Sequence, residues 1–291
     1  HIVGQALKNI INKGYRIVVI DNGSNDNIQK YLQDNFKGSG IKLISLENNI
    51  GFGRANNLAL KEVATNYAFL LNPDAIISEN SLDNLVNEAG KDKKVALANP
   101  LVISTHTLDK NDIHKKVDEY KNNFKTFKES GSTIETDFMC GGYMLIKISS
   151  FKEIGFFDRN IFLYEEDREI SNRSLVNNYK NILVKNSLVY HVGQLSTNIK
   201  NKREQKKTLY FRNWHMGWGK SYLERKRKSY LKVCFKALQK LLSTIIHLII
   251  CDNKKRTIYC ATFCGMTSNL VGISCFNKKN NKTKISSIKL I

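Results

Sequence analysis

The amino-acid sequence predicts an α/β protein in which a mostly parallel sheet carries helices on both faces. Two observations support this. Buried-strand patterns alternate with amphipathic helical patterns over the first hundred residues, as in parallel sheets. From about residue 200 the pattern becomes purely helical and basic. We therefore predict a sheet domain at residues 1–199 and a basic helical region at residues 200–291.

The elements follow in order along the chain. Apolar residues at helical spacing predict a first helix near residues 2–11. We expect strands at residues 15–20, 41–46, 67–71 and 95–100, and helices at residues 53–64 and 79–90 between them. Residues 104–135 are rich in Lys, Asn and Asp and predict a mobile excursion, after which residues 138–147 return to the core.

Composition bounds the class of protein. With 291 residues and 42% hydrophobic side chains the chain can bury a core. A net charge of +20 favours a polyanionic partner. Zinc-ligand spacing, an RNP-like aromatic pattern and an arginine-rich arm are missing, so a nucleic acid is not expected. The six cysteines form no C-x-x-C pair, and we interpret them as reduced, mostly buried thiols of a cytosolic protein.

The tail suggests two alternatives. Its longest apolar run, residues 241–251, is shorter than the roughly 20 residues of a bilayer-crossing helix, so no transmembrane segment is expected. Lysines recur every four residues beside an apolar face, at Lys228, Lys232, Lys236 and Lys240. Such a helix fits an anionic membrane interface or packing on the domain with solvated lysines.

Polar residues gather where the predicted strands end, which is where parallel sheets bind ligands. Asp21, Asn22 and Ser24 follow the first strand and could hold a sugar or base hydroxyl, although an Asx turn explains them equally well. After the next strand, Gly51 would let backbone N–H groups approach a phosphate while Arg54 adds charge, although a tight turn needs the same glycine.

Two further segments carry carboxylates. Asp74 follows the third strand in "LLNPDA", just past Pro73. In "FLYEEDREI" four acidic residues fall within five positions, behind aromatic side chains. A helix first turn explains Glu165 and Glu169. The density of the cluster predicts a site with a carboxyl group of raised pKa.

Five motifs follow one another along the chain: "VVIDNGSND", "NNIGFGRANN", "LLNPDA", "CGGYMLIK" with "FKEIGFFDRNIFLYEEDREISNR", and "VYHVGQLS". In this order they resemble family 2 glycosyltransferases, in particular the bacterial rhamnosyltransferase-like branch. The resemblance spans about residues 1–215. It implies a GT-A fold with a Rossmann-like sheet. It also implies a divalent metal, Mn²⁺ or Mg²⁺, a nucleotide-diphosphate sugar donor and inversion at the anomeric carbon.

The resemblance also implies residue roles. Asp21 matches the nucleoside contact, Asp74 the position that binds metal and diphosphate, Asp167 the general base and His191 a metal or diphosphate ligand. The donor-binding residues would be Asp21, Asn22, Ser24, Asn49, Gly51, Arg54 and Asn72.

Sugar transfer from a nucleotide diphosphate requires the same residue types. Negative charge builds on a departing nucleotide diphosphate, so a carboxylate should hold a cation near the phosphates, and Asp74 fits that need. The attacking hydroxyl must lose a proton, which Asp167 or Glu166 could accept. A lone histidine after a strand, such as His191, is as often a packed structural residue as a ligand.

Two departures from the family are visible. The family opens with a strand before the first helix, whereas this chain begins at His1 inside that helix. We therefore expect the first strand to be missing. The family's usual ED-x-D is "EDRE" here, which puts Glu169 in the second acidic place and leaves its role open.

The expected function is hexosyl transfer in cell-surface polysaccharide synthesis. The donor would be a dTDP-sugar such as dTDP-rhamnose, or a UDP-sugar, and the acceptor a glycan or lipid-linked glycan. The expected location is cytoplasmic, with peripheral contact to the inner face of the plasma membrane. Two alternatives stay open: a nucleotidyltransferase, whose Gly-rich loop would fall in the missing region, and a catalytically silent carbohydrate-binding protein of the same fold.

Overall fold

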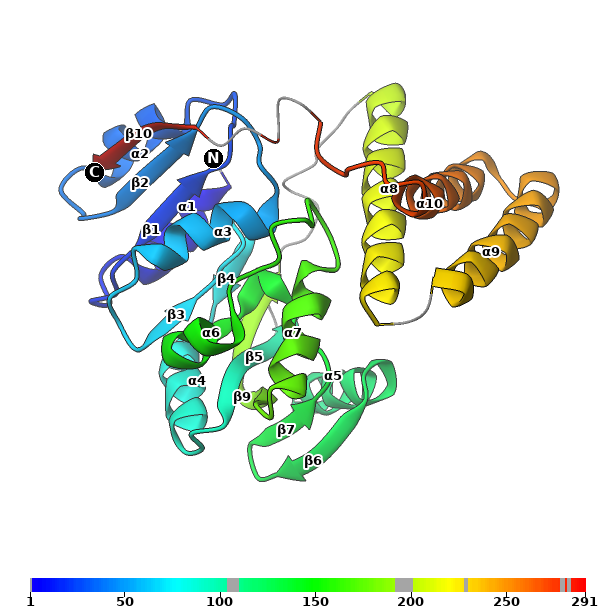
Figure 1. Ribbon diagram of the computed structural model, residues 1–291. Coiled ribbons are helices and arrows are strands. Elements are labelled where there is room, and N and C mark those ends of the chain that lie inside the picture. Colours follow the sequence, from blue (N-terminus) through cyan, green and yellow to red (C-terminus); the bar gives the residue numbers. More distant parts are fainter. Residues whose placement is uncertain (1, 104–109, 192–200, 228–229, 278–280, 282–283) are drawn as a thin grey trace.

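The computed structural model describes residues 2–103, 110–191, 201–227, 230–277, 281 and 284–291 (Figure 1). Two sheets form its centre. The first has the order β1–β2–β10, with strands Val18–Asp21, Lys42–Leu46 and Ile285–Leu290. The second has the order β3–β8–β5–β9–β7–β6, with strands Tyr67–Phe69, Leu145–Lys147, Val95–Ile103, Lys180–His191, Thr133–Thr136 and Thr126–Ser130. Strand β4, Ala75–Ile77, pairs with β9 outside this order.

The α/β class is confirmed, but the sheets are mixed rather than mostly parallel. Only β1–β2 and β5–β9 run parallel among the described pairs. The other six pairs are antiparallel. The alternation of strand and helix predicted the parallel pairs. It could not predict that β8, which follows the excursion, would enter antiparallel between β3 and β5.

Helices cover the sheets and form the C-terminal region. The helices of the first part are α1 (Val3–Ile10), α2 (Ile28–Phe36), α3 (Phe52–Lys61), α4 (Ser81–Gly90), α5 (Lys110–Asn123), α6 (Ile148–Ile154) and α7 (Glu166–Val176). A short 3₁₀ turn, η1, spans Gly141–Tyr143. The C-terminal helices are α8 (Lys202–Arg227), α9 (Tyr230–Ile250) and α10 (Asn253–Leu270). The basic helical region predicted from residue 200 is thus present.

The expected mobile excursion is wrong for its described part. Helix α5 and the hairpin β6–β7 fill residues 110–136, and β7 pairs with β9. Val117 and Ile134 are buried with Leu101 and Leu183. A few apolar residues at regular spacing were enough to bury one face, although the composition is that of a loop. Residues 104–109 lie outside the described part.

The C-terminal region folds back onto the beginning of the chain. Strand β10 pairs antiparallel with β2, so the expectation of a purely helical tail is wrong here. Helices α8 and α10 approach closely at glycines: a Cβ on Gly265 would lie 2.0 Å from the carbonyl oxygen of Trp214. Strand β10 thus lies beside β2 in the first sheet, although α10 belongs to the C-terminal helices (Figure 1).

Helix α9 corrects the expectation about membrane spans. Its 21 residues make it long and apolar enough, by length and composition alone, to cross a membrane. The apolar run at 241–251 gave too short a length for this helix, because Lys232, Lys236 and Lys240 interrupt its earlier turns.

Two expectations concern covalent and terminal features. The six cysteines are free, as expected, but only Cys275 is buried and the other five are partly exposed. Among the described strands, β1 pairs only with β2 and β3 only with β8. A first strand upstream of α1 stays a prediction.

Candidate active site

Hydrogen bonds join the loop after β1 to the loop after β2. Asn22 accepts a hydrogen bond from the N–H of Ile50 at 2.9 Å, and its amide donates to Asn49 Oδ1 at 3.1 Å. Asn49 Oδ1 also accepts from the N–H of Gly51 at 2.9 Å. The two asparagines therefore hold these loops together at the carboxyl ends of adjacent parallel strands.

A local side-chain-to-backbone hydrogen bond closes the turn of the β1 loop. The N–H of Ser24 donates to Asp21 Oδ1 at 2.8 Å. The turn interpretation, which the sequence left open, thus accounts for Asp21 and Ser24. This contact uses only Oδ1 and leaves Oδ2 for a hydroxyl. Donor contact by Asp21 and Ser24 stays a prediction.

Gly51 joins the β2 loop to the acidic segment. It has a φ of +88°, and a Cβ there would lie 2.4 Å from the carbonyl oxygen of Phe162. The next amide, of Phe52, donates to that same oxygen at 3.0 Å. Because the amides of Gly51 and Phe52 already have acceptors, their contacts support the tight-turn interpretation rather than phosphate binding.

Asp74 and His191 meet because of strand register. Antiparallel pairing of β4 with β9 sets Ala75 opposite His191, so Asp74 lies beside the imidazole. Asp74 Oδ2 is 3.4 Å from His191 Nε2. The ring of His191 also packs edge-on against Tyr143, with centroids 5.7 Å apart. The two residues proposed for metal binding, 117 positions apart in the sequence, are therefore neighbours.

This pair is compatible with a divalent metal. It offers one carboxylate and one imidazole, and no group of three or more His, Cys, Asp or Glu side chains suited to a metal occurs among the described residues. Mn²⁺ and Mg²⁺ commonly take few protein ligands and complete their coordination with phosphate oxygens and water. A metal here would thus need the donor diphosphate as a ligand.

The acidic segment enters α7 through an unusual backbone turn. Tyr164 and Glu165 both have positive φ, 64° and 69°, a conformation that is costly for residues with a Cβ. Helix α8 presses on this turn at a glycine: a Cβ on Gly219 would lie 3.0 Å from the Tyr164 carbonyl oxygen. The C-terminal region therefore helps to set the position of the acidic residues.

Burial raises the pKa of both possible bases, and their hydrogen bonds separate them: the N–H groups of Arg168 and Gly141 lower the pKa of Asp167. Glu166 is 6% exposed, and its Oε2 has no hydrogen-bond partner among the described residues. Burial, and then the charge of Asp167, raise the pKa of Glu166 to about 8. Glu166 is therefore largely protonated near pH 7 and a poor base there. Asp167 remains partly exposed, and burial raises the pKa of its carboxyl as well.

The 3₁₀ turn η1 lies between the Asp74–His191 pair and Asp167. The N–H of Gly141 points to Asp167 Oδ2 at 3.4 Å. The carbonyl of Gly142 accepts from the backbone N–H of Asn72 at 2.8 Å, two residues before Asp74. The structure thus brings Asn72, Asp74, His191 and Asp167 around one turn. Their roles toward donor, metal and proton stay predictions.

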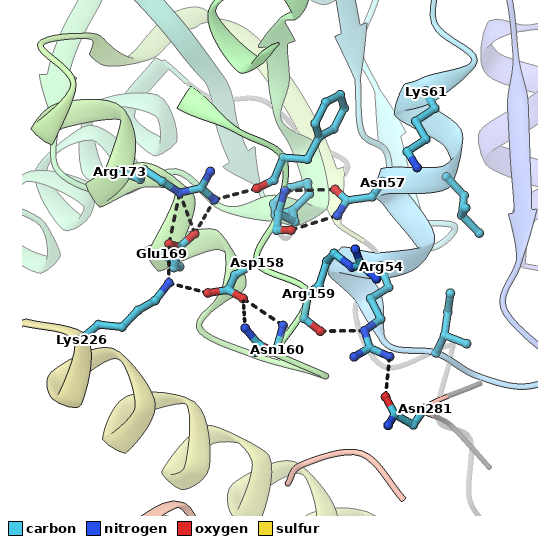
Figure 2. Close-up of a pocket in the computed structure, with 14 residues that line it drawn as sticks. Arg54, Asn57, Lys61, Asp158, Arg159, Asn160, Glu169, Arg173, Lys226 and Asn281 are labelled. Atoms are coloured by element: carbon cyan, nitrogen blue, oxygen red, sulfur yellow. Dashed lines mark hydrogen bonds and ion pairs between the residues drawn. The ribbon is translucent and has the colours of Figure 1, made fainter. Parts of the chain in front are cut away.

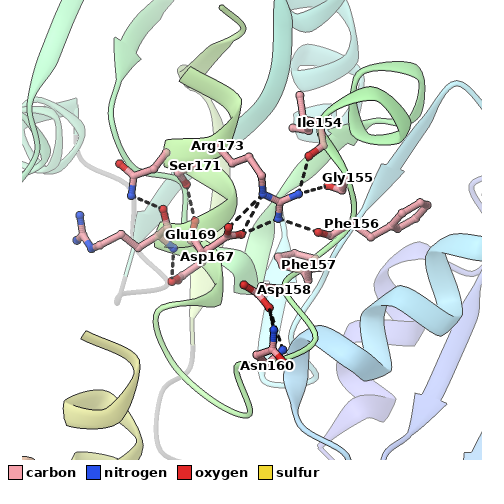
Figure 3. Close-up of polar contacts among 12 residues, drawn as sticks. Ile154, Gly155, Phe156, Phe157, Asp158, Asn160, Asp167, Glu169, Ser171 and Arg173 are labelled. Atoms are coloured by element: carbon pink, nitrogen blue, oxygen red, sulfur yellow. Dashed lines mark hydrogen bonds and ion pairs between the residues drawn. The ribbon is translucent and has the colours of Figure 1, made fainter. Parts of the chain in front are cut away.

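Glu169 has a structural role that the sequence left open. Its carboxylate accepts from Arg173 Nη2 at 2.6 Å and lies 3.3 Å from Lys226 Nζ. Arg173 also donates to the carbonyls of Ile154 and Gly155, at 2.6 and 2.7 Å (Figure 3). This network ties α7 to the turn that precedes the acidic segment, so Glu169 does not belong to the group around η1.

Arg54 is also placed apart from that group. Its Nε donates to the carbonyl of Arg159 at 2.7 Å, and its guanidinium stacks over Phe276 at 3.5 Å. Donor binding by Arg54 stays a prediction that these contacts do not support. Asn57, which sequence reasoning missed, exchanges two hydrogen bonds with the backbone of Phe157. The only signal for it was its place in "GRANN", one turn after Arg54.

Comparisons with known proteins identify the family. The model for "Glycosyl transferase family 2" matches residues 1–155, more than half of the chain. The chain therefore belongs to glycosyl transferase family 2. Two curated relatives are poly-beta-1,6-N-acetyl-D-glucosamine synthases of Staphylococcus epidermidis. They are 27% and 26% identical over 152 residues, which cover 50% of this chain and 35% of each relative. The match thus spans about a third of their length.

Solved structures show the same fold. A mannosyltransferase, PcManGT, from Pyrobaculum calidifontis, in complex with GDP-Man and Mn²⁺, superposes with a TM-score of 0.58. It is 15% identical, over 92% of this chain and 83% of that one. GalNAc-T7, with UDP, GalNAc and Mn²⁺, gives a TM-score of 0.52 at 18% identity over 64% and 40% of the two chains. The GT-A-like fold is therefore confirmed. The rhamnosyltransferase-like branch stays a prediction.

Proposed function

We propose that this protein transfers a hexose from a nucleotide-diphosphate donor to a growing cell-surface polysaccharide. One observation carries the proposal: the fold brings Asp74, His191 and Asp167 together around η1, although they are far apart in the sequence. The chain belongs to a glycosyltransferase family. Its curated relatives are polysaccharide synthases by name, which supports the polysaccharide product.

The proposed reaction divides the work between the two carboxylates. Asp74 and His191 would hold a divalent metal, which would supply positive charge to the diphosphate leaving group. Asp167 would accept the proton of the acceptor hydroxyl as its oxygen bonds to the anomeric carbon. The bond from that carbon to the diphosphate breaks on the opposite face, so the configuration inverts. Donor hydroxyls would be held by the loops of Asp21, Asn22 and Asn49.

The donor proposed first is dTDP-rhamnose or another dTDP-sugar, with UDP-sugars second. The branch resemblance supports the first, and the N-acetylglucosamine in the names of the curated relatives supports the second. The acceptor proposed is a lipid-linked glycan at the cytoplasmic face of the membrane.

A panel of nucleotide sugars tests this function. A preferred donor should raise the melting temperature in the presence of Mn²⁺, by mass action on the folded state, and much less with EDTA. Transfer should release a nucleoside diphosphate. Release of pyrophosphate from a nucleoside triphosphate and a sugar phosphate would instead identify a nucleotidyltransferase. Binding without any turnover would favour a silent carbohydrate-binding protein.

Membrane contact is proposed for α9. This helix lies at the outer end of the C-terminal region, away from the sheets (Figure 1). Val233, Ala237 and Thr244 are buried, whereas an apolar stripe on the other side is exposed: Leu231, Phe235, Leu238, Leu242, Ile245, Ile246 and Ile249. By helical geometry Lys232 borders the stripe, whereas Lys236 pairs with Glu224 of α8 and Lys240 lies over the ring of Tyr259 of α10.

Charge supports an anionic lipid surface as the partner of this stripe. Residues 200–291 hold 22 of the 46 Lys and Arg residues but only 3 of the 26 Asp and Glu residues. Nearly all of the surplus positive charge thus lies in the region that carries α9. An exposed apolar stripe on a helix of a strongly basic region favours a helix that lies in the interface plane of an anionic membrane.

We expect the wild-type protein to sediment with phosphatidylglycerol vesicles but not with phosphatidylcholine vesicles. Replacing Leu231, Leu242 and Ile249 together by glutamine should weaken binding by roughly tenfold or more, because about 1.5–3 kcal/mol accompanies full burial of each such side chain. Vesicle sedimentation measures the effect. Val176→Gln with Val271→Gln is the control, because both valines are exposed outside α9. Unchanged binding by the triple variant would remove α9 from the contact.

A further inference from the structure

A cavity of about 760 Å³ lies beside the acidic segment (Figure 2). Helix α3 contributes Arg54 and Lys61 to its wall, and the turn after α6 contributes Arg159. Glu169 and Arg173 of α7 and Lys226 of α8 complete it. The cavity therefore lies between the sheet domain and the C-terminal helices.

This cavity is separate from the group around η1. Asp167 faces Gly141, whereas Glu169 lines the cavity. Two positions along a helix rotate a side chain by about 200°, so the two carboxylates lie on opposite faces of α7. Asp21, Asn22, Asp74 and His191 do not line the cavity. Among the residues predicted to bind metal or donor, only Arg54 lines the cavity. Its contacts with Arg159 and Phe276 place it apart from the others, so a ligand here would lie outside the group around η1.

The charges within the cavity do not balance. Asp158 and Glu169 are its two lining carboxylates, and both are paired with Lys226, while Arg173 also pairs with Glu169. Three cations have no carboxylate partner among the described residues: Arg54, Lys61 and Arg159. Arg54 is held by neutral oxygens, at the Arg159 carbonyl and at Asn281 Oδ1.

The surplus cations repel each other. Burial, and then the positive charge of Arg159, lower the pKa of Arg54. Arg159 and Lys61 are exposed, and their side chains make no hydrogen bond or ion pair with any residue that the structure describes. A bound anion would relieve this repulsion, and guanidinium groups match the oxygens of a phosphate well.

We propose that this cavity binds the phosphate or diphosphate group of a second ligand, through Arg54, Lys61 and Arg159. A neighbouring cavity of about 540 Å³ shares Arg54, Asn160, Lys226 and Asn281 with it and adds the aromatic side chains of Trp218, Tyr222 and Phe276. An apolar group attached to the phosphate would find these rings next to it. A lipid-linked diphosphate fits both cavities, with the diphosphate in the first and the apolar chain in the second. This choice of ligand rests on the function proposed above.

The probe is pyrophosphate, titrated calorimetrically into the full chain in EDTA so that a metal-dependent donor site is silent. The variant is Arg159→Gln with Lys61→Gln, because neither side chain supports the fold by a described contact. We expect this double variant to bind pyrophosphate about tenfold more weakly, since two charge-assisted contacts are lost.

The matched control is Lys30→Gln with Lys37→Gln, two exposed lysines in and just after α2. It removes the same net charge far from the cavity and should leave binding unchanged. Asp74→Asn should also leave it unchanged. Absence of binding by the wild-type protein, or equal weakening in the two double variants, would overturn the proposal. Because no sugar is transferred, failure here does not test the proposed function.

Two further titrations identify the source of the phosphate. Farnesyl diphosphate carries an apolar chain and should bind more tightly than pyrophosphate if the aromatic rings contribute. UDP should bind no more tightly than pyrophosphate. Tighter binding of UDP in EDTA, lost in Arg159→Gln with Lys61→Gln, would still support a phosphate site but would assign it to a nucleotide. Binding of either ligand that is unaffected by the double variant counts against the site.

Discussion

Replacing Asp167 by asparagine is expected to slow sugar transfer by roughly 10²–10⁴-fold, the usual cost of removing a general base. Donor affinity should stay nearly unchanged. The side chain keeps its size, and an amide oxygen can still accept from the Arg168 N–H, at 2.8 Å in the native protein. Steady-state transfer rates and calorimetric donor titration measure the two effects separately.

Glu166→Gln is the matched control for this prediction. Because the pKa of Glu166 is raised to about 8, the native side chain is mostly neutral near pH 7, and glutamine imitates that state. We expect its transfer rate at pH 7 to fall only a few-fold. If Glu166→Gln abolishes transfer while Asp167→Asn does not, the base has been assigned to the wrong residue.

The pH dependence follows from the same carboxyl group. Burial raises the pKa of Asp167 above its ordinary value, and only its deprotonated form accepts a proton. Transfer should therefore decline as the pH falls through that raised pKa. In Asp167→Asn the residual rate should lose this acidic limb. An unchanged acidic limb in the variant would assign it to another group.

Replacing Asp74 by asparagine is expected to weaken Mn²⁺-dependent donor binding by on the order of tenfold or more, because even indirect partners of a metal contribute 10–100-fold. The fold should persist, since Asp74 lies in the turn between β3 and β4. Donor titration with and without Mn²⁺ measures the effect. The rate with saturating donor should suffer less than in Asp167→Asn, so the two variants separate binding from proton transfer.

Asp34→Asn removes the same charge from the exposed surface of α2 and should leave donor binding unaltered. His191→Gln tests the other member of the pair. It removes the imidazole that lies 3.4 Å from Asp74, and should weaken Mn²⁺ dependence in the same direction. Identical Mn²⁺ dependence of donor binding in the wild type and in Asp74→Asn would remove the pair from the proposed metal site.

The fold class and much of the candidate site could be predicted from the sequence. Strand β2 and helix α4 lie within two residues of their expected bounds and helix α3 within three, because their apolar periodicity is local. The motifs around Asn22, Asp74, Asp167 and His191 could be found because each follows a strand or begins a helix. Strand ends indicate where such residues gather, but the antiparallel register of β4 and β9 that sets Asp74 beside His191 was visible only in the structure.

Other features needed the tertiary structure. Helix α5 and hairpin β6–β7 were missed because composition outweighed a weak periodicity. Strand β10 was missed because its partner β2 lies more than 230 positions earlier in the sequence. Sequence spacing says nothing about which edge such a strand will find.

By itself, the sequence determined the family, the strand-end carboxylates and the basic tail, because these are properties of residues and their order. Only the tertiary structure decided how the carboxylates differ. Glu166 is buried, Asp167 is partly exposed and Glu169 is paired with Arg173 and Lys226. The physical reason is that burial and charge pairing depend on neighbours that come from distant segments, such as α8 at Lys226. Adjacent residues of one helix turn therefore acquire different surroundings and different hydrogen-bond and ion-pair partners.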